Sequence, residues 1–413
     1  MLTKNEPVID GVMWKTVSEA CNLACDYCYY SRCSGMPGRF ERIDEEVLEK
    51  FIKEYTTLKR GIVPFVWQGG EPLMAGITFF KKIIALQKKY STRNKKITNA
   101  IQTNGTLINK FWAQFFKENN FLVGISLDGP KAIHDKRRVR SNGRGSYDAV
   151  MRGVQHLRNE SVDFNVITVI HEDNVHKAKE LMAFYKEQNM DFIQFIPCMD
   201  FLSQEADQQP QFHITAQEYG QFLCEAFDIW YNDGKPDTSI RFFDNMLAVY
   251  LHQTPELCQH RKYCPTMLVL EQNGDAYPCD FYIQDDYKLG NVGEDSLEEI
   301  LQNPILQEFV QQKPVISEKC VDCPFLDLCN GGCVRNRNRE NPQETEYFCE
   351  AYKMIYAYAD EGMQSIADRI KQEQLMHYLN SVYPMPERND RCLCGSGLKF
   401  KKCCYRLIER KAL

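Results

Sequence analysis

Several features are missing from this 413-residue sequence, and each absence narrows what the protein can be. No run of about 18 apolar residues exists, so we expect no membrane-spanning helix. The first residues include Lys4, Glu6 and Asp10 and form no apolar segment, so we expect no secretory signal peptide and a cytoplasmic location. There are no internal repeats or low-complexity tracts, and a hydrophobic content of 44% excludes a mainly disordered chain.

Cysteine, by contrast, is abundant: the chain has 18 cysteines, with a formal net charge of −6. Because a cytoplasmic protein keeps its thiols reduced, tight cysteine spacings indicate metal or redox chemistry rather than disulfides. Apart from an isolated pair at Cys198 and Cys224, the cysteines fall into three groups, within 21–33, 258–349 and 392–404. We therefore expect three separate metal-binding regions.

From residue 12 to about 230, short strand-like runs alternate with longer amphipathic segments. The predicted strands are 12–17, 62–67, 97–102, 121–127, 164–170 and 192–197. The predicted helices are 44–59, 77–90, 109–119, 146–159 and 173–188, with further helical stretches at 215–250 and 350–375. This alternation predicts a parallel sheet, arranged as an open or partial (β/α) barrel. Ligands of such folds bind at the carboxyl ends of the strands.

The first cysteine group follows the first predicted strand directly, in the string CNLACDYC. The spacing of Cys21, Cys25 and Cys28 lets one loop wrap three thiolates around one face of a cubane iron–sulfur cluster. Three ligands leave one iron free to bind a small molecule, whereas structural zinc and ordinary electron-transfer clusters take four. A zinc site that borrows Cys33 is the alternative. CxxxCxxC after a first strand resembles the radical S-adenosylmethionine superfamily.

This resemblance implies a 4Fe–4S cluster whose open iron chelates S-adenosylmethionine, which one electron cleaves to a 5′-deoxyadenosyl radical. A second motif of the superfamily, GGEP, follows the second predicted strand. The residues that align with cofactor-contacting positions are Tyr27, Gly69, Gly70, Glu71, Ser126, Arg138 and Met199. Arg137 is the rival of Arg138 because both lie in one basic run. A strand-end serine that only satisfies the backbone is the alternative for Ser126.

The middle cysteine group is similar to the SPASM extension of peptide-modifying radical enzymes, which carries two auxiliary 4Fe–4S clusters. The cysteines implied for the first auxiliary cluster are Cys258, Cys264, Cys279 and Cys333. Those implied for the second are Cys320, Cys323, Cys329 and Cys349. Ligation by eight thiolates favours electron transfer over substrate binding at iron. Two zinc ions with four thiolates each are the alternative.

Longer sequence strings indicate a resemblance to one particular family within this superfamily. CNLACDYCYY, QGGEP, QTNGTLI, FLVGISLDGP, RFFDNML, YPCDFY and GGCVRNR together resemble the anaerobic sulfatase-maturating enzymes. Those enzymes oxidise a cysteine or serine of an unfolded sulfatase to Cα-formylglycine. The resemblance implies that Asp280, directly after Cys279, removes the side-chain proton of the substrate as a base. A surface aspartate in a turn is the alternative. A flavodoxin- or ferredoxin-type protein is expected as the electron donor.

The end of the chain differs in charge from the rest. Residues 388–413 contain eight Lys/Arg and two Asp/Glu, a net charge of +6. RNDRCLCGSGLKFKKCC resembles the SEC-C zinc motif, which implies a zinc ion held by Cys392, Cys394, Cys403 and Cys404. An unligated reactive tail is the alternative. The flanking lysines offer a basic face, so we hypothesise docking to the ribosome, its RNA or an export chaperone.

The sequence thus predicts an α/β protein of three parts. A partial (β/α)6 TIM-like barrel is expected over 1–230, a SPASM domain over 231–382, and a linker with a SEC-C zinc motif over 383–413. A radical S-adenosylmethionine oxidoreductase that matures sulfatases is the leading hypothesis. The second is another SPASM peptide maturase that forms thioether or carbon–carbon crosslinks. The third is a zinc-rich interaction protein without catalysis.

Overall fold

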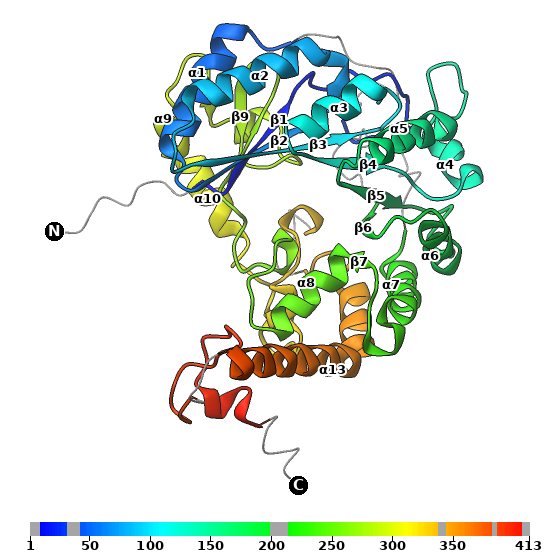
Figure 1. Ribbon diagram of the computed structural model, residues 1–413, viewed down its shortest axis with the longest axis vertical. Helices are drawn as coiled ribbons and strands as arrows, with labels where there is room; N and C mark the ends of the chain where they lie inside the picture. The colour runs from blue at the N-terminus through cyan, green and yellow to red at the C-terminus, as the bar shows by residue number, and fades with distance from the viewer. Residues whose placement is uncertain (1–8, 31–41, 199–213, 338–343, 382–385, 407–413) are drawn as a thin grey trace, which may run out of the picture. The chain divides into compact units, whose positions relative to one another are not determined.

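The computed structural model describes residues 9–30, 42–198, 214–337, 344–381 and 386–406, which form two compact units (Figure 1). The first unit comprises the chain up to 176 together with 183–214 and 263–312, and the second comprises 177–182, 215–262 and 313 onward. In the described part of the chain, no helix is both long and apolar enough to cross a membrane. The bounds of the three domains expected from the sequence stay predictions.

The first unit is built around one sheet, in the strand order β10-β9-β8-β1-β2-β3-β4-β5-β6. Neighbouring strands from β8 to β6 are parallel, and β9 pairs antiparallel with β8 and β10. The strands are β1 (Gly11–Lys15), β2 (Ile62–Gln68), β3 (Lys96–Thr103), β4 (Phe121–Ser126), β5 (Phe164–Ile170), β6 (Phe192–Pro197), β8 (Met267–Leu270), β9 (Asp275–Tyr277) and β10 (Gly290–Asn291). All six predicted strands are present. Sequence periodicity did not indicate β8–β10 because these strands have only 4, 3 and 2 residues.

Helices connect the parallel strands from β1 to β6, two more helices follow β10, and Figure 1 shows α1, α2 and α3 over one face of the sheet. The helices are α1 (Glu45–Leu58), α2 (Ile77–Tyr90), α3 (Lys110–Glu118), α4 (Lys131–Arg137), α5 (Tyr147–Asn159), α6 (Ala178–Glu187), α9 (Leu297–Leu301) and α10 (Pro304–Gln312). The predicted helix 173–188 begins later, at Ala178. A turn precedes it, in which the Asn174 side chain accepts a hydrogen bond from the His171 N–H at 2.8 Å.

The amino-terminal part of the core is aromatic. Asp44, where the predicted helix 44–59 begins, caps α1 by accepting a hydrogen bond from the Glu46 N–H at 2.8 Å. The apolar side of α1 then packs on β1 and β2. Phe51 meets Trp14 edge to face at 5.0 Å between ring centroids, and Trp14 stacks on Trp67 at 6.1 Å. Trp14 and Trp67 stand directly before Lys15 and Gln68, the last residues of β1 and β2, so this packing helps to position the ends of both strands.

The second unit is mainly helical. Its elements are α7 (Ala216–Tyr231), β7 (Ser239–Ile240), α8 (Arg241–Tyr250), α11 (Glu318–Val321), α12 (Leu326–Cys329) and α13 (Cys349–Ser381). The helical stretch predicted at 215–250 divides into α7 and α8 because Asn232 and Asp233 adopt left-handed backbone conformations. Gly220 lets α7 approach α13 closely, since a Cβ there would lie 3.0 Å from the Ala351 Cα. Cys349 is the first residue of α13.

Candidate cofactor and metal sites

The first cysteine group occupies the loop after β1. Cys21, Cys25 and Cys28 lie close enough that each thiolate would disfavour ionisation of its neighbours. Burial raises the pKa of the Cys21 thiol to about 12 and that of Cys25 further. Such thiols stay protonated unless bound metal stabilises their thiolates. The three neighbouring thiols of this loop therefore fit a cluster site with three protein ligands.

Two N–H groups point at the sulfur of Cys21. The Leu23 backbone N–H lies 3.4 Å from Cys21 Sγ, and the Asn104 side-chain amide lies 3.7 Å from it. Asn104 follows β3 directly, so the sheet itself supports the cysteine loop. Sequence reasoning did not include Asn104 among the site residues, although its position at a strand end in QTNG placed it at this edge.

The predicted GGEP motif forms the turn after β2. Gly69 and Gly70 both have positive φ, and a Cβ on Gly70 would lie 2.0 Å from the Ala20 carbonyl oxygen. The Glu71 N–H donates to that same carbonyl at 2.8 Å. Only glycine at position 70 allows the turn to pack directly against the residue before Cys21.

Glu71 is fully buried, and its carboxylate is engaged within the protein. It accepts hydrogen bonds from the Leu73 N–H at 3.0 Å, the Thr103 hydroxyl at 2.7 Å and the Asn104 N–H at 2.8 Å. Burial raises the pKa of Glu71 to about 7, although these three donors oppose the rise. In the structure Glu71 thus joins the ends of β2 and β3.

Tyr27 and Arg138 meet at the buried carboxylate of Asp128, which was not among the predicted cofactor-binding residues. The Tyr27 hydroxyl donates to Asp128, and Arg138 Nε lies 2.9 Å from Asp128 Oδ2. The Arg138 guanidinium also lies over the Tyr27 ring, 5.3 Å from its centroid. Burial opposes ionisation of Asp128, but Arg138 and His134 outweigh it and hold the Asp128 pKa below its usual range. Asp128 therefore positions both side chains beside the cysteine loop.

The remaining predicted cofactor residues are placed as follows. Arg137, the rival of Arg138, instead pairs with Asp173, Glu172 and Asp26. Ser126 ends β4 half-buried, and its hydroxyl accepts a hydrogen bond from the Gln102 amide at 3.0 Å. Met199 lies outside the described residues.

Asp280 lies at the carboxyl edge of the same sheet. Its Oδ1 is 3.1 Å from Lys15 Nζ, and its Oδ2 accepts hydrogen bonds from the Tyr30 hydroxyl at 2.7 Å and from the Tyr29 hydroxyl. Lys15 ends β1, and the tyrosines follow Cys28. The Asp280 side chain is only 10% exposed. Local sequence patterns do not reveal this arrangement, because some 250 residues separate Asp280 from Tyr29 and Tyr30.

Two further side chains from strand ends complete the surroundings of Asp280. Gln68, the last residue of β2, donates to the Tyr30 hydroxyl at 2.7 Å. Glu271, which follows β8, lies 3.4 Å from Lys15 Nζ. Because β8, β1 and β2 are parallel neighbours, their carboxyl ends bring Glu271, Lys15 and Gln68 together. Asp280 is thus held by one cation and two hydroxyl groups in a largely buried setting.

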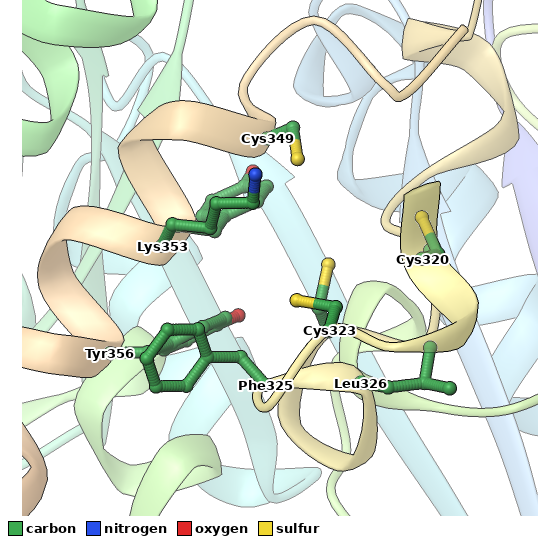
Figure 2. Close-up of a pocket in the computed structure, with 10 residues that line it drawn as sticks. Cys320, Cys323, Phe325, Leu326, Cys349, Lys353 and Tyr356 are labelled. Carbon is green, nitrogen blue, oxygen red and sulfur yellow. The ribbon is translucent and has the colours of Figure 1, made fainter. Parts of the chain in front are cut away.

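The four cysteines predicted for the second auxiliary cluster line one pocket in the second unit. Cys320, Cys323, Cys329 and Cys349 share its wall with aromatic side chains and with Lys353. Figure 2 shows Lys353 extending along this opening toward Cys349. Burial raises the pKa of Cys329 to about 12, so its thiolate also needs bound metal for stabilisation. Four thiols around one opening fit a fully ligated cluster.

The four cysteines predicted for the first auxiliary cluster are divided between the two units. Cys264 and Cys279 are half-buried in the first unit, and Cys279 precedes Asp280. Cys258 and Cys333 belong to the second unit, where burial, followed by the nearby Cys258, raises the pKa of Cys333 to about 11. Within the second unit, these two thiols therefore lie close to each other.

The carboxyl-terminal cysteines gather into one site. The sulfurs of Cys392, Cys394, Cys403 and Cys404 all lie within 4.8 Å of one another. Neighbouring sulfurs are 3.4–3.9 Å apart. Zn–S bonds of about 2.3 Å in a tetrahedron place sulfurs about 3.8 Å apart, so the set fits zinc closely. The site packs on α13, because Leu375 shares its apolar core with Phe400 and Cys404.

Comparison with known families matches three parts of the chain. Residues 16–185 match the Radical SAM superfamily, residues 262–324 match an iron–sulfur cluster-binding domain named SPASM, and residues 388–406 match the SEC-C motif. The first two matches imply 4Fe–4S clusters and S-adenosylmethionine as cofactors.

Individual proteins are similar over most of the chain. A cysteine-type anaerobic sulfatase-maturating enzyme of Clostridium novyi is 37% identical over 84% of this chain and 94% of its own. A serine-type enzyme of Bacteroides thetaiotaomicron is 34% identical over 88% of this chain and 92% of its own. The solved structure of native anSMEcpe with bound AdoMet has 35% identity and a TM-score of 0.82, covering 87% of this chain and 99% of that one. Another structure of that protein also holds a peptide.

Proposed function

The chain belongs to the anaerobic sulfatase-maturating enzymes, and from this premise we propose that it oxidises a cysteine or serine of an unfolded sulfatase to Cα-formylglycine. The observation that carries this proposal is the placement of Asp280. Its carboxylate lies at the same sheet edge as the loop of Cys21, Cys25 and Cys28, next to the tyrosines that follow this loop. A base for the substrate and a site for radical generation are thereby within one unit.

The oxidation removes one hydrogen atom from Cβ, one proton from the thiol or hydroxyl, and one further electron. For serine this gives the aldehyde directly; for cysteine it gives a thioaldehyde, which water converts to the aldehyde with release of hydrogen sulfide. The bound 4Fe–4S cluster with S-adenosylmethionine supplies the 5′-deoxyadenosyl radical that takes the hydrogen atom. Asp280 takes the proton. Lys15 and the hydroxyls of Tyr29 and Tyr30 hold the carboxylate in place for this transfer.

The residues proposed to bind the cofactors follow the sequence motifs. Cys21, Cys25 and Cys28 would hold the catalytic cluster. S-adenosylmethionine would be bound by Tyr27, Gly69, Gly70, Glu71, Ser126, Arg138 and Met199. The two auxiliary clusters would be held by Cys258, Cys264, Cys279 and Cys333 and by Cys320, Cys323, Cys329 and Cys349, and would supply an acceptor for the substrate electron. Support comes from the three-thiol loop, the Arg138–Asp128–Tyr27 contacts and the four-cysteine pocket.

The experiment that tests this function uses anaerobically reconstituted protein with S-adenosylmethionine and a reductant. Peptides containing Cys-x-Pro-x-Arg or Ser-x-Pro-x-Arg are added, and a hydrazide reagent traps any aldehyde before mass spectrometry. We expect trapped aldehyde in at least one peptide. Mass loss without trapped aldehyde would contradict formylglycine formation and favour the crosslinking alternative.

Asp280→Asn is the informative variant in this assay. It removes the base but keeps the side-chain volume, so we expect cleavage of S-adenosylmethionine with about a hundredfold less aldehyde. Asp275→Asn is the matched control, because Asp275 is a carboxylate of the same unit whose partners are Lys288 and Asn291. Equal loss of aldehyde in both variants would argue against Asp280 as the base.

We also propose two partners beyond the sulfatase. A flavodoxin- or ferredoxin-type protein would donate the electrons, and the basic tail around Lys399, Lys401 and Lys402 would dock on the ribosome, its RNA or an export chaperone. Such docking would bring the enzyme to the sulfatase before it folds. Deletion of residues 388–413 should reduce ribosome co-sedimentation and co-translational modification, while peptide modification in vitro continues. Unchanged co-sedimentation and co-translational modification would contradict this docking.

A further inference from the structure

His134 is a fully buried histidine that the proposed reaction does not use. It is 0% exposed and lies on α4, which Figure 1 shows beside α5. Burial lowers the pKa of His134 to about 4, so the imidazole is neutral at neutral pH. A neutral imidazole has one nitrogen that donates a hydrogen bond and one that accepts. The partners of these two nitrogens therefore define what the ring holds in place.

Both ring nitrogens have partners, and together the partners fix the tautomer. The Asp128 backbone N–H donates to Nδ1 at 3.3 Å, so Nδ1 is the unprotonated nitrogen. Nε2 therefore carries the hydrogen and donates to the Ser146 hydroxyl oxygen at 2.9 Å. The Ser146 hydroxyl in turn donates to the Arg138 carbonyl at 2.7 Å. His134 thus connects the backbone of Asp128 to the backbone of Arg138 through a chain of hydrogen bonds.

Asp128 and Arg138 are the two members of the buried ion pair beside the cysteine loop. Arg138 Nε lies 2.9 Å from Asp128 Oδ2, and the guanidinium lies over the Tyr27 ring. The other oxygen of Asp128 accepts a hydrogen bond from the Val169 N–H at 3.0 Å, which connects the carboxylate to β5. Because His134 holds the main chain of both members of the ion pair, it fixes where the guanidinium stands relative to Tyr27.

The segment that carries Arg138 also contacts the cysteine loop directly. Val139 accepts a hydrogen bond from the Ala24 N–H at 2.7 Å and pairs with Gly145 in an antiparallel bridge. Gly145 precedes Ser146, so the hydrogen bonds of Ser146 close the turn that begins at Arg138. An apolar side chain would fill the space of the buried ring but would leave the Asp128 N–H without this acceptor, which costs free energy. The imidazole therefore does more than fill space.

We propose that His134, acting through Ser146, is a positioning residue that holds Arg138 where its guanidinium binds S-adenosylmethionine. This inference rests on the proposed role of Arg138 in cofactor binding and goes beyond it by assigning the two residues that keep Arg138 in place. A shift of about 1 Å weakens the hold of a guanidinium on a ligand strongly, because hydrogen bonds depend steeply on distance and angle. Loss of the His134–Ser146 connection thus weakens cofactor binding although every proposed cofactor-binding side chain is still present.

The test is the affinity of the anaerobically reconstituted full chain for S-adenosylmethionine, measured by equilibrium dialysis without a reductant, so that no cleavage occurs. The amide of an asparagine reaches the place of histidine Nδ1, and that of a glutamine reaches the place of Nε2. His134→Asn keeps the acceptor for the Asp128 N–H but loses the donor to Ser146, so we expect a dissociation constant about tenfold higher. His134→Gln keeps that donor and should bind within about twofold of the wild type.

Ser146→Ala removes the far end of the connection and should weaken binding by the same factor. Ser146 precedes α5, but its hydroxyl caps no N–H of that helix in the described part of the chain, so the variant removes no helix cap. Because the two residues act in series, His134→Asn combined with Ser146→Ala should bind no more weakly than either single variant. In the reduced protein, each should raise the KM for S-adenosylmethionine and leave the kcat of its cleavage nearly unchanged. A residue that only stabilises the fold would not give this coupling or this split.

Gln87→Leu is the matched control. Gln87 is also buried in the first unit, and its amide and that of Asn99 hydrogen-bond each other at 2.9 Å. Asn99 lies four residues before the end of β3, away from the carboxyl edge of the sheet. The variant breaks this buried pair of hydrogen bonds, so it should lower the resistance of the protein to unfolding and leave the affinity for S-adenosylmethionine unchanged.

The outcomes separate this inference from the proposed function. If Arg138→Met binds S-adenosylmethionine as tightly as the wild type, the cofactor role of Arg138 is wrong and the inference falls with it. Arg138→Lys, which keeps a charge for Asp128, replaces this variant if Arg138→Met does not retain its cluster. If the Arg138 variant binds weakly while His134→Asn and Ser146→Ala bind normally, this inference alone is overturned.

Two further results would also overturn the role of His134. One is equal weakening of cofactor binding in His134→Asn and His134→Gln, because only the first loses the donor to Ser146. The other is loss of the cluster: if His134→Asn does not retain it, Ser146→Ala decides alone, and cluster loss there as well would show general support of the fold.

Discussion

Lys15 Nζ lies 3.1 Å from Asp280 Oδ1, so the last residue of β1 is the counter-ion of the proposed base. Both side chains are largely buried, at 5% and 10% exposure. Since water screens such a pair weakly, removal of one charge changes both the position and the energy of the other. The ion pair connects the first strand of the chain to Asp280, which lies in the second half of the sequence.

Lys15→Met should uncouple radical formation from product formation. Without its counter-ion, the Asp280 carboxylate loses its fixed position, so we expect about tenfold less aldehyde per S-adenosylmethionine cleaved, equivalent to about 1.4 kcal/mol. The ratio of 5′-deoxyadenosine to formylglycine peptide measures this. Lys50→Met is the control, because Lys50 belongs to the same unit and pairs with Glu54. An unchanged ratio in Lys15→Met would show that Asp280 does not depend on this ion pair.

Tyr30→Phe should also reduce aldehyde formation. The Tyr30 hydroxyl connects Gln68 to Asp280, and a hydrogen bond to a charged group contributes about 1.5–3 kcal/mol. We expect about a tenfold lower rate of peptide oxidation, measured under single-turnover conditions. Tyr90→Phe removes a similar bond, from the Tyr90 hydroxyl to Glu49 at 2.6 Å, and should leave the rate unchanged. Equal rates in the two variants would exclude a role for the Tyr30 hydroxyl.

Gly70→Ala should reduce iron binding at the first cysteine group. The new Cβ would lie 2.0 Å from the Ala20 carbonyl oxygen, so the turn or the cysteine loop must move. We expect loss of most of the catalytic cluster, measured as iron content in a chain whose auxiliary cysteines are intact. Gly61→Ala is the matched control: Gly61 also has positive φ, but a Cβ there meets nothing within 4 Å. Full iron retention in Gly70→Ala would contradict the importance of this close approach.

Cys404→Ser should remove zinc without affecting iron. Cys404 is buried in the four-sulfur site, and a serine oxygen is a poor substitute for a thiolate in tetrahedral zinc coordination. We expect one zinc per chain in the wild type and almost none in the variant, by elemental analysis, with faster hydrogen exchange around Leu375. Cys224→Ser, which changes a half-buried thiol of α7, should keep the zinc. Retention of zinc by Cys404→Ser would refute the assignment.

Local sequence signals predicted much of the fold. The predicted helix 44–59 agrees with α1, and alternation of strands and helices indicated six parallel strands, all of which are present. Helix ends that depend on turns were less predictable. The turn at Asn174 delays α6, and left-handed conformations at Asn232 and Asp233 divide α7 from α8, since side-chain hydrogen bonds and backbone sterics decide such boundaries.

Cysteine spacing by itself indicated three regions that could hold metals, because ligand geometry requires thiols at short intervals, whereas the resemblance implied the ligand sets of the two auxiliary clusters. In the tail the four sulfurs lie within 4.8 Å of one another, and in the loop of Cys21–Cys28 the thiols lie close enough to influence each other's ionisation. The surroundings of Asp280 could not be found this way. Lys15, Tyr30 and Glu271 reach it from strand ends and loops far apart in sequence, and no local spacing records such contacts. Only the parallel pairing of β8 with β1 decided them, because it places the carboxyl ends of distant strands side by side.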